Sequence, residues 1–462
     1  MTFLGKAPRP DSFPRKRRAG KRLFNAAAGV LGILLLGGCS ILSELNLFAP
    51  PPPSATPSST TTIETTTPLA SPTQAATAPS KQDQNHLILW VPPEFDPQSG
   101  TEAGDLFHNR LGEFINAHPG LTIDVRVKAA SGPGGLLESL STTSAAAPAA
   151  IPSLVVLSRT EMETAALKGL VYPWAGIVKT SDAADVYPYA KSLGNVQGTN
   201  YGLAFSGDAL VMVFRPLQVG YAPTSWNEYL ARGYPVIFPA ADPQAELMTQ
   251  VLLSNAPEGQ IPPEHPVVDQ EELKKSYFVI NEGVKNAVFP YWLADYDTFD
   301  KGYQAFLENR ANYAVVWAST VINQLPENVS LAPLPAINAA PFTLANGWMW
   351  VLTNPSEEKR QLTVALAEYL VDPKFLAEWT EAARLLPTSQ SILKQWKIQT
   401  DVTTLNDVAS SARVIPSNEF TSSVSPILQQ GVLGMVRGQI NYLQALENSM
   451  KDLKLITPAT GG

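Results

Sequence analysis

Two short stretches of the sequence carry side chains suited to binding a small polar molecule. One is Glu94 with Phe95, and the other is Ser158 with Arg159. A carboxylate accepts hydrogen bonds from ligand hydroxyls, a serine hydroxyl donates or accepts, and a guanidinium donates from a planar fork. Two plainer interpretations stay open: Glu94 as a solvated loop charge, and Ser158 with Arg159 as the cap of a helix that begins near Glu161.

Other kinds of chemistry find little support in the residue spacing. The Gly-rich stretch at residues 132–135 lacks both the G-x-G-x-x-G spacing and the Lys-Ser/Thr of a phosphate loop. The four histidines are scattered, so no metal site is expected, and there is no G-x-S-x-G motif. Carboxylates are plentiful enough for a glycosidase pair, but nothing singles out two of them. The sequence therefore predicts no metal, cofactor or catalytic residue.

The candidate residues follow apolar runs that must position them. Residues 87–91 and 153–157 are continuous apolar runs, typical of strands covered on both faces. Residues 121–127 alternate apolar and polar side chains, which also predicts a strand. Helical stretches separate these strands, so we expect a parallel sheet in an α/β lobe. Ligands collect beyond the carboxyl ends of such strands, where the candidates lie.

The second half of the chain is also mixed. Strands are expected at residues 210–214 and 314–317, and one long amphipathic helix is expected from Leu428 to Met450. No later apolar run has the length of a membrane span. The roughly 370 residues from about 85 onward exceed the size at which one core usually keeps growing, so two domains or lobes are expected.

Cys39 is the only cysteine among 462 residues. A basic segment and an apolar run, residues 23–36, precede it, and that run is shorter than the ~20 residues of a membrane span. The thiol fits a lipid attachment point, a free thiol, an intermolecular disulfide or chance placement in a signal anchor. The sequence Leu36-Gly37-Gly38-Cys39 resembles the lipobox of bacterial lipoproteins. That resemblance implies a lipid on Cys39 and a signal peptide at residues 1–38.

A spacer is expected to follow at residues 39–85. Between residues 40 and 84 the sequence holds eight prolines and sixteen Ser or Thr residues, a composition that cannot bury enough surface to fold. Beyond residue 38, which leaves out eight of the 33 basic and one of the 41 acidic side chains, the formal charge is −15. Such a charge repels nucleic acid.

Nine segments between about residues 86 and 455 occur in a characteristic order. They are LILWVPPEF, HPGLTIDVRV, IPSLVVLSRTEMETAALKGLVYPW, NYGLAFSGDALVMVFRP, TSWNEYLARGYPVIFPA, ANYAVVWAST, VSLAPLPA, NGWMWVLTNPSEEKRQLTVALAEYL and ARLLPTS. Together the series resembles the extracellular solute-binding proteins of ABC importers, of the maltose-binding-like type. The resemblance implies an α/β fold with two lobes (the type II periplasmic-binding-protein fold), a hinge and a ligand in the cleft between the lobes.

The resemblance also implies where the lobes begin and end. Lobe 1 is expected at residues 86–211 and 337–384, and lobe 2 at residues 215–330 and 388–456. The segments that cross between them are expected near residues 211–215, 331–336 and 385–389.

Further site residues follow from the resemblance. Phe205, Ser206 and Asp208 fall where the family places ligand-facing residues, and a carboxylate beside a ring suits a sugar. A turn with a core Phe is the plainer alternative there. Trp317, followed by Ser319, lies where the second-lobe stacking tryptophan of the family tends to lie.

Three later residues complete the candidate set. Trp348 and Trp350 are expected to alternate across their strand, so that at most one of them, Trp348, faces the cleft and the other packs inside. Arg384 precedes a crossing segment, where it would reach the ligand or form a salt bridge between the lobes.

The function that the sequence predicts is a lipid-anchored, extracytoplasmic receptor and not an enzyme. Such a receptor would be a monomer that hands a small solute, a sugar or oligosaccharide, to the permease of an ABC importer. Two alternatives stay open: a secreted lipoprotein enzyme acting on glycans, and a sensing or adhesion receptor without transport.

Overall fold

The structure is a computed structural model that describes residues 85–174, 184–256, 267–337, 340–353, 357–397 and 401–456. The expected signal peptide, Cys39 and the spacer lie outside these described residues. The described residues all belong to one compact unit. Within the described ranges, no helix combines the length and the apolar character needed to cross a bilayer.

Strands form one mixed sheet and one small hairpin. In chain order the strands are β1 (His86–Val91), β2 (Thr122–Val127), β3 (Leu154–Ser158), β4 (Asn195–Val196), β5 (Thr199–Asn200), β6 (Gly202–Phe214), β7 (Val236–Ile237), β8 (Tyr313–Trp317), β9 (Ser330–Ala332), β10 (Thr343–Leu352) and β11 (Ala412–Val414). The main sheet has the order β2-β1-β3-β10-β6-β8-β7, with β11 beside β10 and β9 beside β6, while β4 pairs with β5.

Helices cover this sheet in two groups. The first group comprises η1 (Pro93–Phe95), α2 (Glu102–Ala117), α3 (Leu136–Ala146), η2 (Pro148–Ala150), α4 (Arg159–Leu167), α5 (Pro188–Leu193), α12 (Glu357–Leu370), α13 (Pro373–Ala383) and α14 (Gln390–Leu393). The second comprises α6 (Pro216–Val219), α7 (Trp226–Arg232), α8 (Glu246–Leu253), α9 (Gln270–Lys285), η3 (Tyr291–Asp295), α10 (Phe299–Leu307), α11 (Ala318–Val321), α15 (Val402–Ser411), α16 (Asn418–Ser423), α17 (Ser425–Val436) and α18 (Tyr442–Ile456).

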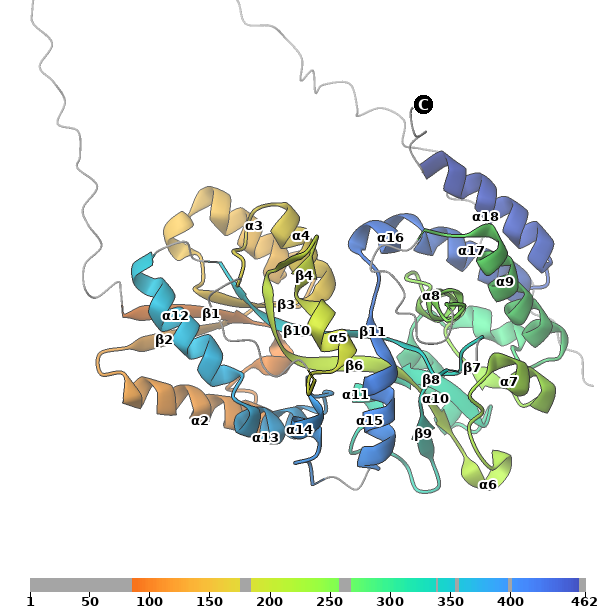
Figure 1. The fold of residues 1–462 in the computed structure, drawn as a ribbon, viewed down its shortest axis with the longest axis horizontal. Coiled ribbons are helices and arrows are strands. Elements are labelled where there is room, and N and C mark those ends of the chain that lie inside the picture. Colours follow the sequence, from red (N-terminus) through yellow and green to blue (C-terminus); the bar gives the residue numbers. More distant parts are fainter. Residues whose placement is uncertain are drawn as a thin grey trace, which may run out of the picture. The chain divides into compact units, whose positions relative to one another are not determined.

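The N-terminal half is a sheet between two helical layers, as its apolar runs predict. Leu87 and Leu89 point to a core shared with α2, α12 and α13, whereas Ile88 and Trp90 point to the other core, with α3 and α4. Strands β2, β1 and β3 are parallel, which confirms the expected parallel arrangement. Figure 1 shows α2 on one side of these strands and α3 and α4 on the other, while α12 shares the core that contains α2.

Strand β6 joins the two halves of the sheet. Its first part pairs with β10 as far as Ala209, and from Leu210 onward it pairs with β8 instead. In Figure 1, β6 runs through the centre between the two groups of helices. The change of pairing partner from β10 to β8 therefore takes place within one continuous strand, β6.

A third segment joins β6 at the same place. Gly207 and Leu386 exchange two backbone hydrogen bonds, each of 2.7 Å. The ring of Tyr189 packs where a Gly207 side chain would lie, and its hydroxyl donates to the Pro387 carbonyl at 2.8 Å. This pairing lies within residues 385–389, one of the three expected crossing segments.

Two expectations for the C-terminal half need correction. Residues 331–336 do not cross: β9 pairs with β6, and Ala336 exchanges backbone hydrogen bonds with residues 224–226 of the second half. The long helix expected from Leu428 to Met450 is two helices, α17 and α18. They separate because Gly438 adopts a left-handed φ of 67° and its N–H returns to the Met435 carbonyl.

Candidate functional site

A cavity of about 620 Å³ lies where strands from the two halves end. Strands β1 and β3 point their carboxyl ends toward it from one half, and β8 does so from the other. Its lining residues are Glu94, Phe95, Ser158, Asp208, Glu246, Asp300, Trp317, Ser319, Thr320, Asn346, Gly347, Trp348, Ala383 and Leu385. The cavity is therefore built by both halves, at the strand ends where a ligand site is expected.

Ser158 lines the cavity and also caps a helix, so the cap interpretation is confirmed, while its contact with a ligand stays a prediction. Its Oγ accepts from the Glu161 N–H at 3.5 Å, which caps α4, and donates to the Glu161 carboxylate at 3.3 Å. Burial raises the pKa of Glu161 to about 7, against the lowering effect of these bonds. The cap fixes the hydroxyl at the edge of the cavity.

One wall of the cavity is aromatic. Phe95 is buried and meets Trp348 edge to face, with 5.3 Å between ring centroids. Trp348 is partly exposed, as a ring that touches a ligand must be. On the other side Trp317 is also partly exposed, and its ring packs edge-on against Phe299 at 6.1 Å. Rings from both halves thus border the same space.

Asp208 connects the two halves by hydrogen bonds. It lies on β6 opposite Asn346 of β10, and its carboxylate accepts from the Ser319 N–H at 3.0 Å and from the Ser319 hydroxyl. Burial raises the pKa of Asp208 to about 6, although these hydrogen bonds oppose the rise. Ser319 lies in α11 of the second half. Both Asp208 and Ser319 line the cavity, so their hydrogen bonds join the two halves at the cavity wall.

Glu246 is a cavity residue that we did not predict. It opens α8, where its N–H donates to the Asp242 carboxylate at 2.8 Å. Burial, together with the nearby Asp242 and Asp208 carboxylates, raises the pKa of Glu246 to about 8. A proton-holding carboxyl beside an ionised one can both donate and accept hydrogen bonds.

Phe205 and Ser206 do not lie in the cavity, contrary to expectation. Phe205 is 3% exposed and stacks on Trp350 at 5.4 Å, within the core beneath α2 and α13. Ser206 is 0% exposed. Of the three residues predicted in this part of β6, only Asp208 reaches the cavity, so the plainer interpretation of a core Phe is correct.

Trp348 lines the cavity and Trp350 does not, but the expected reason is wrong. Residues two apart on a strand share a face, and both rings pack toward the same core. They differ in position along β10: Trp350 lies deeper, against Phe107 and Phe205, whereas Trp348 lies opposite Ser158 at the strand end.

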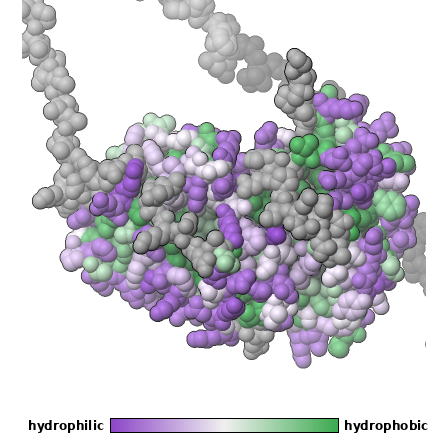
Figure 2. Space-filling view, viewed as in Figure 1, coloured by the Kyte–Doolittle hydropathy of each residue, from purple (hydrophilic) through white to green (hydrophobic). Residues whose placement is uncertain are grey.

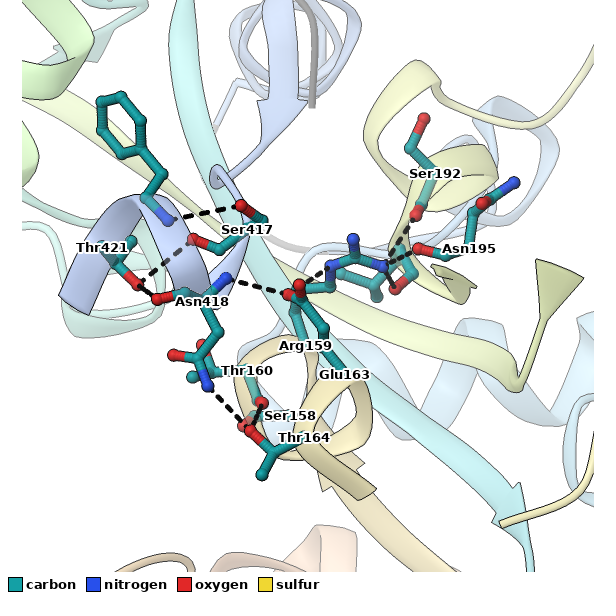
Figure 3. A network of polar contacts seen from close by, with 12 residues as sticks. Ser158, Arg159, Thr160, Glu163, Thr164, Ser192, Asn195, Ser417, Asn418 and Thr421 are labelled. Carbon is teal, nitrogen blue, oxygen red and sulfur yellow. Dashed lines mark hydrogen bonds and ion pairs between the residues drawn. The ribbon is translucent and has the colours of Figure 1, made fainter. Parts of the chain in front are cut away.

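Arg159 is a structural residue rather than a cavity residue. It is 1% exposed, and its guanidinium donates to the carbonyls of Leu193 (3.1 Å) and Asn195 near the end of α5 (Figure 3). Its Nε lies 4.0 Å from the Glu163 carboxylate. A buried guanidinium needs such acceptors, and helix-terminal carbonyls supply them.

The same network links α4 to α16. Glu163 accepts from the Asn418 N–H at 3.0 Å, and the Asn418 amide donates to the Thr164 hydroxyl at 2.7 Å (Figure 3). Arg159 therefore holds Glu163 in place for a contact between the two halves of the molecule.

Arg384 lies at the end of α13 and does not line the cavity. It is exposed and adopts a left-handed φ of 59°, while its neighbours Ala383 and Leu385 line the cavity. The backbone of Arg384 thus positions Ala383 and Leu385 in the cavity wall, whereas the Arg384 side chain lies outside it.

Six lining residues besides Glu246 escaped the sequence analysis: Asp300, Thr320, Asn346, Gly347, Ala383 and Leu385. The strand-end rule explains the position of Glu246 once the structure shows that β7, parallel to β8, precedes its loop, but a strand of two residues gives no pattern in the sequence. Asn346 lies beside Trp348 in the NGWMW segment. In the part of the chain that the structure describes, no cluster of His, Cys, Asp or Glu could hold a metal ion.

A second, smaller cavity of about 290 Å³ adjoins the first. It shares Glu246 and Asn346 with the larger cavity. Most of its other lining residues carry uncharged polar side chains: Thr160, Gln244, Thr249, Asn418, Thr421 and Ser422. Asn418 also bonds α4, so this cavity lies beside the contact between the halves.

A family model described as bacterial extracellular solute-binding protein matches residues 113–405. The chain belongs to this family. Membership of an extracellular family places the solute-binding protein outside the cytoplasm, and it confirms the resemblance that the nine segments carry. No curated protein matches the sequence.

Solved structures confirm the two-lobed fold of the solute-binding protein. Maltose-bound MalE3 of T. maritima matches with a TM-score of 0.60 and 17% identity, over 80% of this chain and 100% of that one. MalE from Xanthomonas citri matches at 0.65 and 18%, over 80% and 97% of the chains. MalE from Listeria monocytogenes in complex with maltose matches at 0.63 and 14%, over 82% and 100%. At these identities the likeness concerns the fold.

Proposed function

We propose that this solute-binding protein captures a carbohydrate between its lobes and delivers it to the permease of an ABC importer. The observation that carries the proposal is the cavity of about 620 Å³, in which Trp317 and Trp348 lie with Ser158, Ser319 and Asp208. Aromatic rings pack on the apolar face of a sugar, while hydroxyls and carboxylates exchange hydrogen bonds with its hydroxyl groups. Structural relatives solved with maltose support this choice of ligand class.

Capture requires the lobes to move about a hinge, as in other binding proteins of this kind. The lobes proposed keep the expected ranges except near the second crossing: lobe 1 comprises residues 86–211 and 346–384, and lobe 2 comprises residues 215–342 and 388–456, because residues 331–336 pair within the second half. The change of partner strand between Ala209 and Leu210 supports a hinge there, and the pairing of Gly207 with Leu386 supports a second hinge segment. For the remaining crossing we propose Thr343–Ala345, where β10 pairs with β11 before it joins β6.

The proposed receptor is tethered by a lipid on Cys39, with residues 39–85 as the spacer. A receptor that serves a membrane permease gains from being held near it, because tethering raises the local concentration of the loaded receptor. The Pro-, Ser- and Thr-rich composition supports an extended spacer rather than a further domain.

Calorimetric titration of the purified chain against a panel of neutral sugars and maltodextrins tests the proposal. We expect at least one sugar to bind with micromolar or tighter affinity, about −8 kcal/mol, and to raise the melting temperature. If no carbohydrate in the panel binds or stabilises the protein, the carbohydrate proposal is wrong.

A glycan-cleaving enzyme is a second candidate, because Asp208 and Glu246 line one cavity with raised pKa values. A glycosidase needs one carboxylic acid that keeps its proton and one carboxylate. Incubating the protein with each sugar it binds and analysing the products by chromatography separates the two functions. A receptor leaves the sugar intact, whereas any release of shorter products identifies an enzyme.

A further inference from the structure

The larger cavity has an unbalanced acidic lining. Glu94, Asp208, Glu246 and Asp300 contribute carboxyl groups from four different elements, and no lysine, arginine or histidine is among the lining residues. The four carboxyl groups come from both halves, from the loop after β1, from β6, and from the first turns of α8 and α10. A solute held there is therefore surrounded by negative charge on more than one side.

The protein itself does not neutralise this charge. Within the ranges that the structure describes, none of these four carboxylates forms an ion pair. Lys301, the cation next to Asp300 in sequence, pairs with Asp297 at 2.6 Å. Arg384 is exposed and outside the lining. Clustering carboxylates without cations is unfavourable in the empty site: burial raises the pKa of Glu246, and the nearby Asp242 and Asp208 carboxylates raise it further.

The aromatic rings of the cavity favour the same kind of ligand. Trp317 and Trp348 line the cavity together with the carboxylates. A cation over the face of a tryptophan is attracted by the ring, more strongly where water is excluded. The tryptophan rings alone would bind a neutral sugar as well as a cationic one. The preference for a cationic solute is therefore expected to come from the carboxylates.

The adjoining cavity suits hydroxyl groups instead. Its polar lining residues apart from Glu246 are uncharged, and Thr249, which is 3% exposed, has a hydroxyl without a hydrogen-bond partner in the described residues. Glu246 and Asn346 belong to both cavities. A single solute could therefore place a cationic group on the acidic side of Glu246 and hydroxyl groups on the other.

We propose that the solute is a cationic sugar, a carbohydrate that carries at least one protonated amine. The amine would lie among the carboxylates of Asp208, Glu246 and Asp300, and its sugar rings would pack on the tryptophans. This inference rests on the proposed function and narrows its ligand class. It explains an acidic cavity that a neutral maltodextrin would leave uncompensated.

The test compares three trisaccharides by calorimetry with the full-length chain at low ionic strength. They are the trimer of glucosamine, its N-acetylated counterpart and maltotriose, with spermidine as a cation that has no sugar ring. We expect the glucosamine trimer to bind at least about ten-fold tighter than either neutral sugar, and added salt to reduce that preference. Equal or tighter binding of a neutral sugar overturns the inference but leaves the carbohydrate function standing.

Variants locate the source of the preference. Asp208→Asn should reduce the preference for the amine by about ten-fold, and Glu94→Gln and Asp300→Asn, both at exposed positions, test the same point if Asp208→Asn does not fold. Glu447→Gln removes one carboxylate from an exposed position on α18 and should leave the preference unchanged. A preference that survives all three cavity variants, or that falls as much in Glu447→Gln, overturns the inference.

The remaining outcomes bear on the proposed function. Tight binding of spermidine without binding of any sugar would overturn the carbohydrate function, and the cationic-sugar inference with it. Binding of the glucosamine trimer alone among the sugars supports both.

Discussion

Trp317 borders the cavity and Trp350 lies in the core, so we expect truncation of these two rings to have different effects. Trp317 is partly exposed at the end of β8 and lines the cavity. We expect Trp317→Ala to weaken sugar binding by at least ten-fold, about 1.4 kcal/mol, with a smaller effect on the free energy of unfolding, because the ring's free face awaits a ligand. Titration calorimetry and urea unfolding of the same preparation measure the two quantities.

Trp350 supplies the matched control. It is 4% exposed and packs against Phe107 and Phe205. Trp350→Ala should therefore cost about 3–5 kcal/mol of stability, the usual range for an aromatic core truncation. If Trp317→Ala destabilises the fold as much as Trp350→Ala does, Trp317 is a core residue and not a ligand contact.

Glu246 makes stability depend on pH. Its pKa of about 8 in the folded protein exceeds its ordinary value of 4.5, so the folded state holds a proton that the unfolded chain has lost between these pH values. The associated stability is fully present below pH 4.5 and is lost as the pH rises through 8. Glu246→Gln, which cannot ionise, should flatten this decline and gain about 1–3 kcal/mol at pH 9, since one pKa unit corresponds to about 1.4 kcal/mol.

Urea unfolding between pH 4 and pH 9 measures that effect. The charged groups near Glu246 are all acidic, namely Asp242, Asp208 and, across the cavity, Glu94 and Asp300, so none offsets its charge. Glu447→Gln serves as the control with the same chemical change at an exposed position. An unchanged pH profile in Glu246→Gln would show that another group causes the decline.

At the level of residues, the sequence predicted the kinds of side chain in the site, namely rings, hydroxyls and carboxylates, better than it predicted which residues supply them. Asp208, Trp317, Ser319 and Trp348 lie in the cavity, whereas Phe205 lies in the core only three residues from Asp208. Sequence cannot say which face of a strand meets a cavity when both faces are buried, as they are along most of β6. The contribution of each residue to ligand binding stays a prediction.

At the scale of elements, the close contact between Gly207 of β6 and Tyr189 of α5 leaves no room for a side chain at position 207. A Cβ on Gly207 would lie 2.3 Å from a ring carbon of Tyr189, at the point where β6 pairs with Leu386. We expect Gly207→Ala to destabilise the protein by about 1–3 kcal/mol, because the buried ring cannot move without disturbing its hydrogen bond to Pro387. Urea unfolding measures the loss.

Gly112 is the control for that variant. It lies inside α2, and a Cβ there would meet nothing within 4 Å. Gly112→Ala should stabilise the protein by about 0.5–1 kcal/mol, because alanine favours a helix. A harmless Gly207→Ala would contradict the packing described here.

Helices and strands with strong apolar patterns could be predicted from the sequence. Elements whose ends depend on backbone conformation, or whose existence depends on strand pairing, could not. The runs of β1 and β3 are apolar on both faces, so both strands were predicted within a residue or two. The C-terminal apolar pattern continues across the break between α17 and α18, so only the left-handed conformation of Gly438 shows where the first helix ends. Strand β7 has two residues, too few to give a pattern.

For the whole molecule, the ordered series of segments predicted the family and the two-lobed fold, which the family match and the solved structures confirm. The lobe boundaries could not be placed as well, because residues 331–336 pair within the second half and only the strand register reveals this. Figure 2 shows hydrophilic side chains over much of the visible face, in keeping with the acidic composition.

The proposed anchor gives a prediction for the intact protein in its cell. Cys39→Ser should abolish labelling with radioactive palmitate and release the protein from the membrane fraction, because Cys39 is the only thiol in the sequence that could carry a lipid. Fractionation followed by immunoblotting measures the release. Unchanged labelling and fractionation in Cys39→Ser would show that the anchor is wrong.

Because β6 belongs to both halves of the sheet, its central peptide groups cannot keep their geometry when one half turns against the other. The backbone amides around Ala209 and Leu210 would then exchange their protons with solvent at a rate that depends on occupancy. We therefore expect deuterium uptake at this one peptide to differ between the empty and the ligand-bound protein.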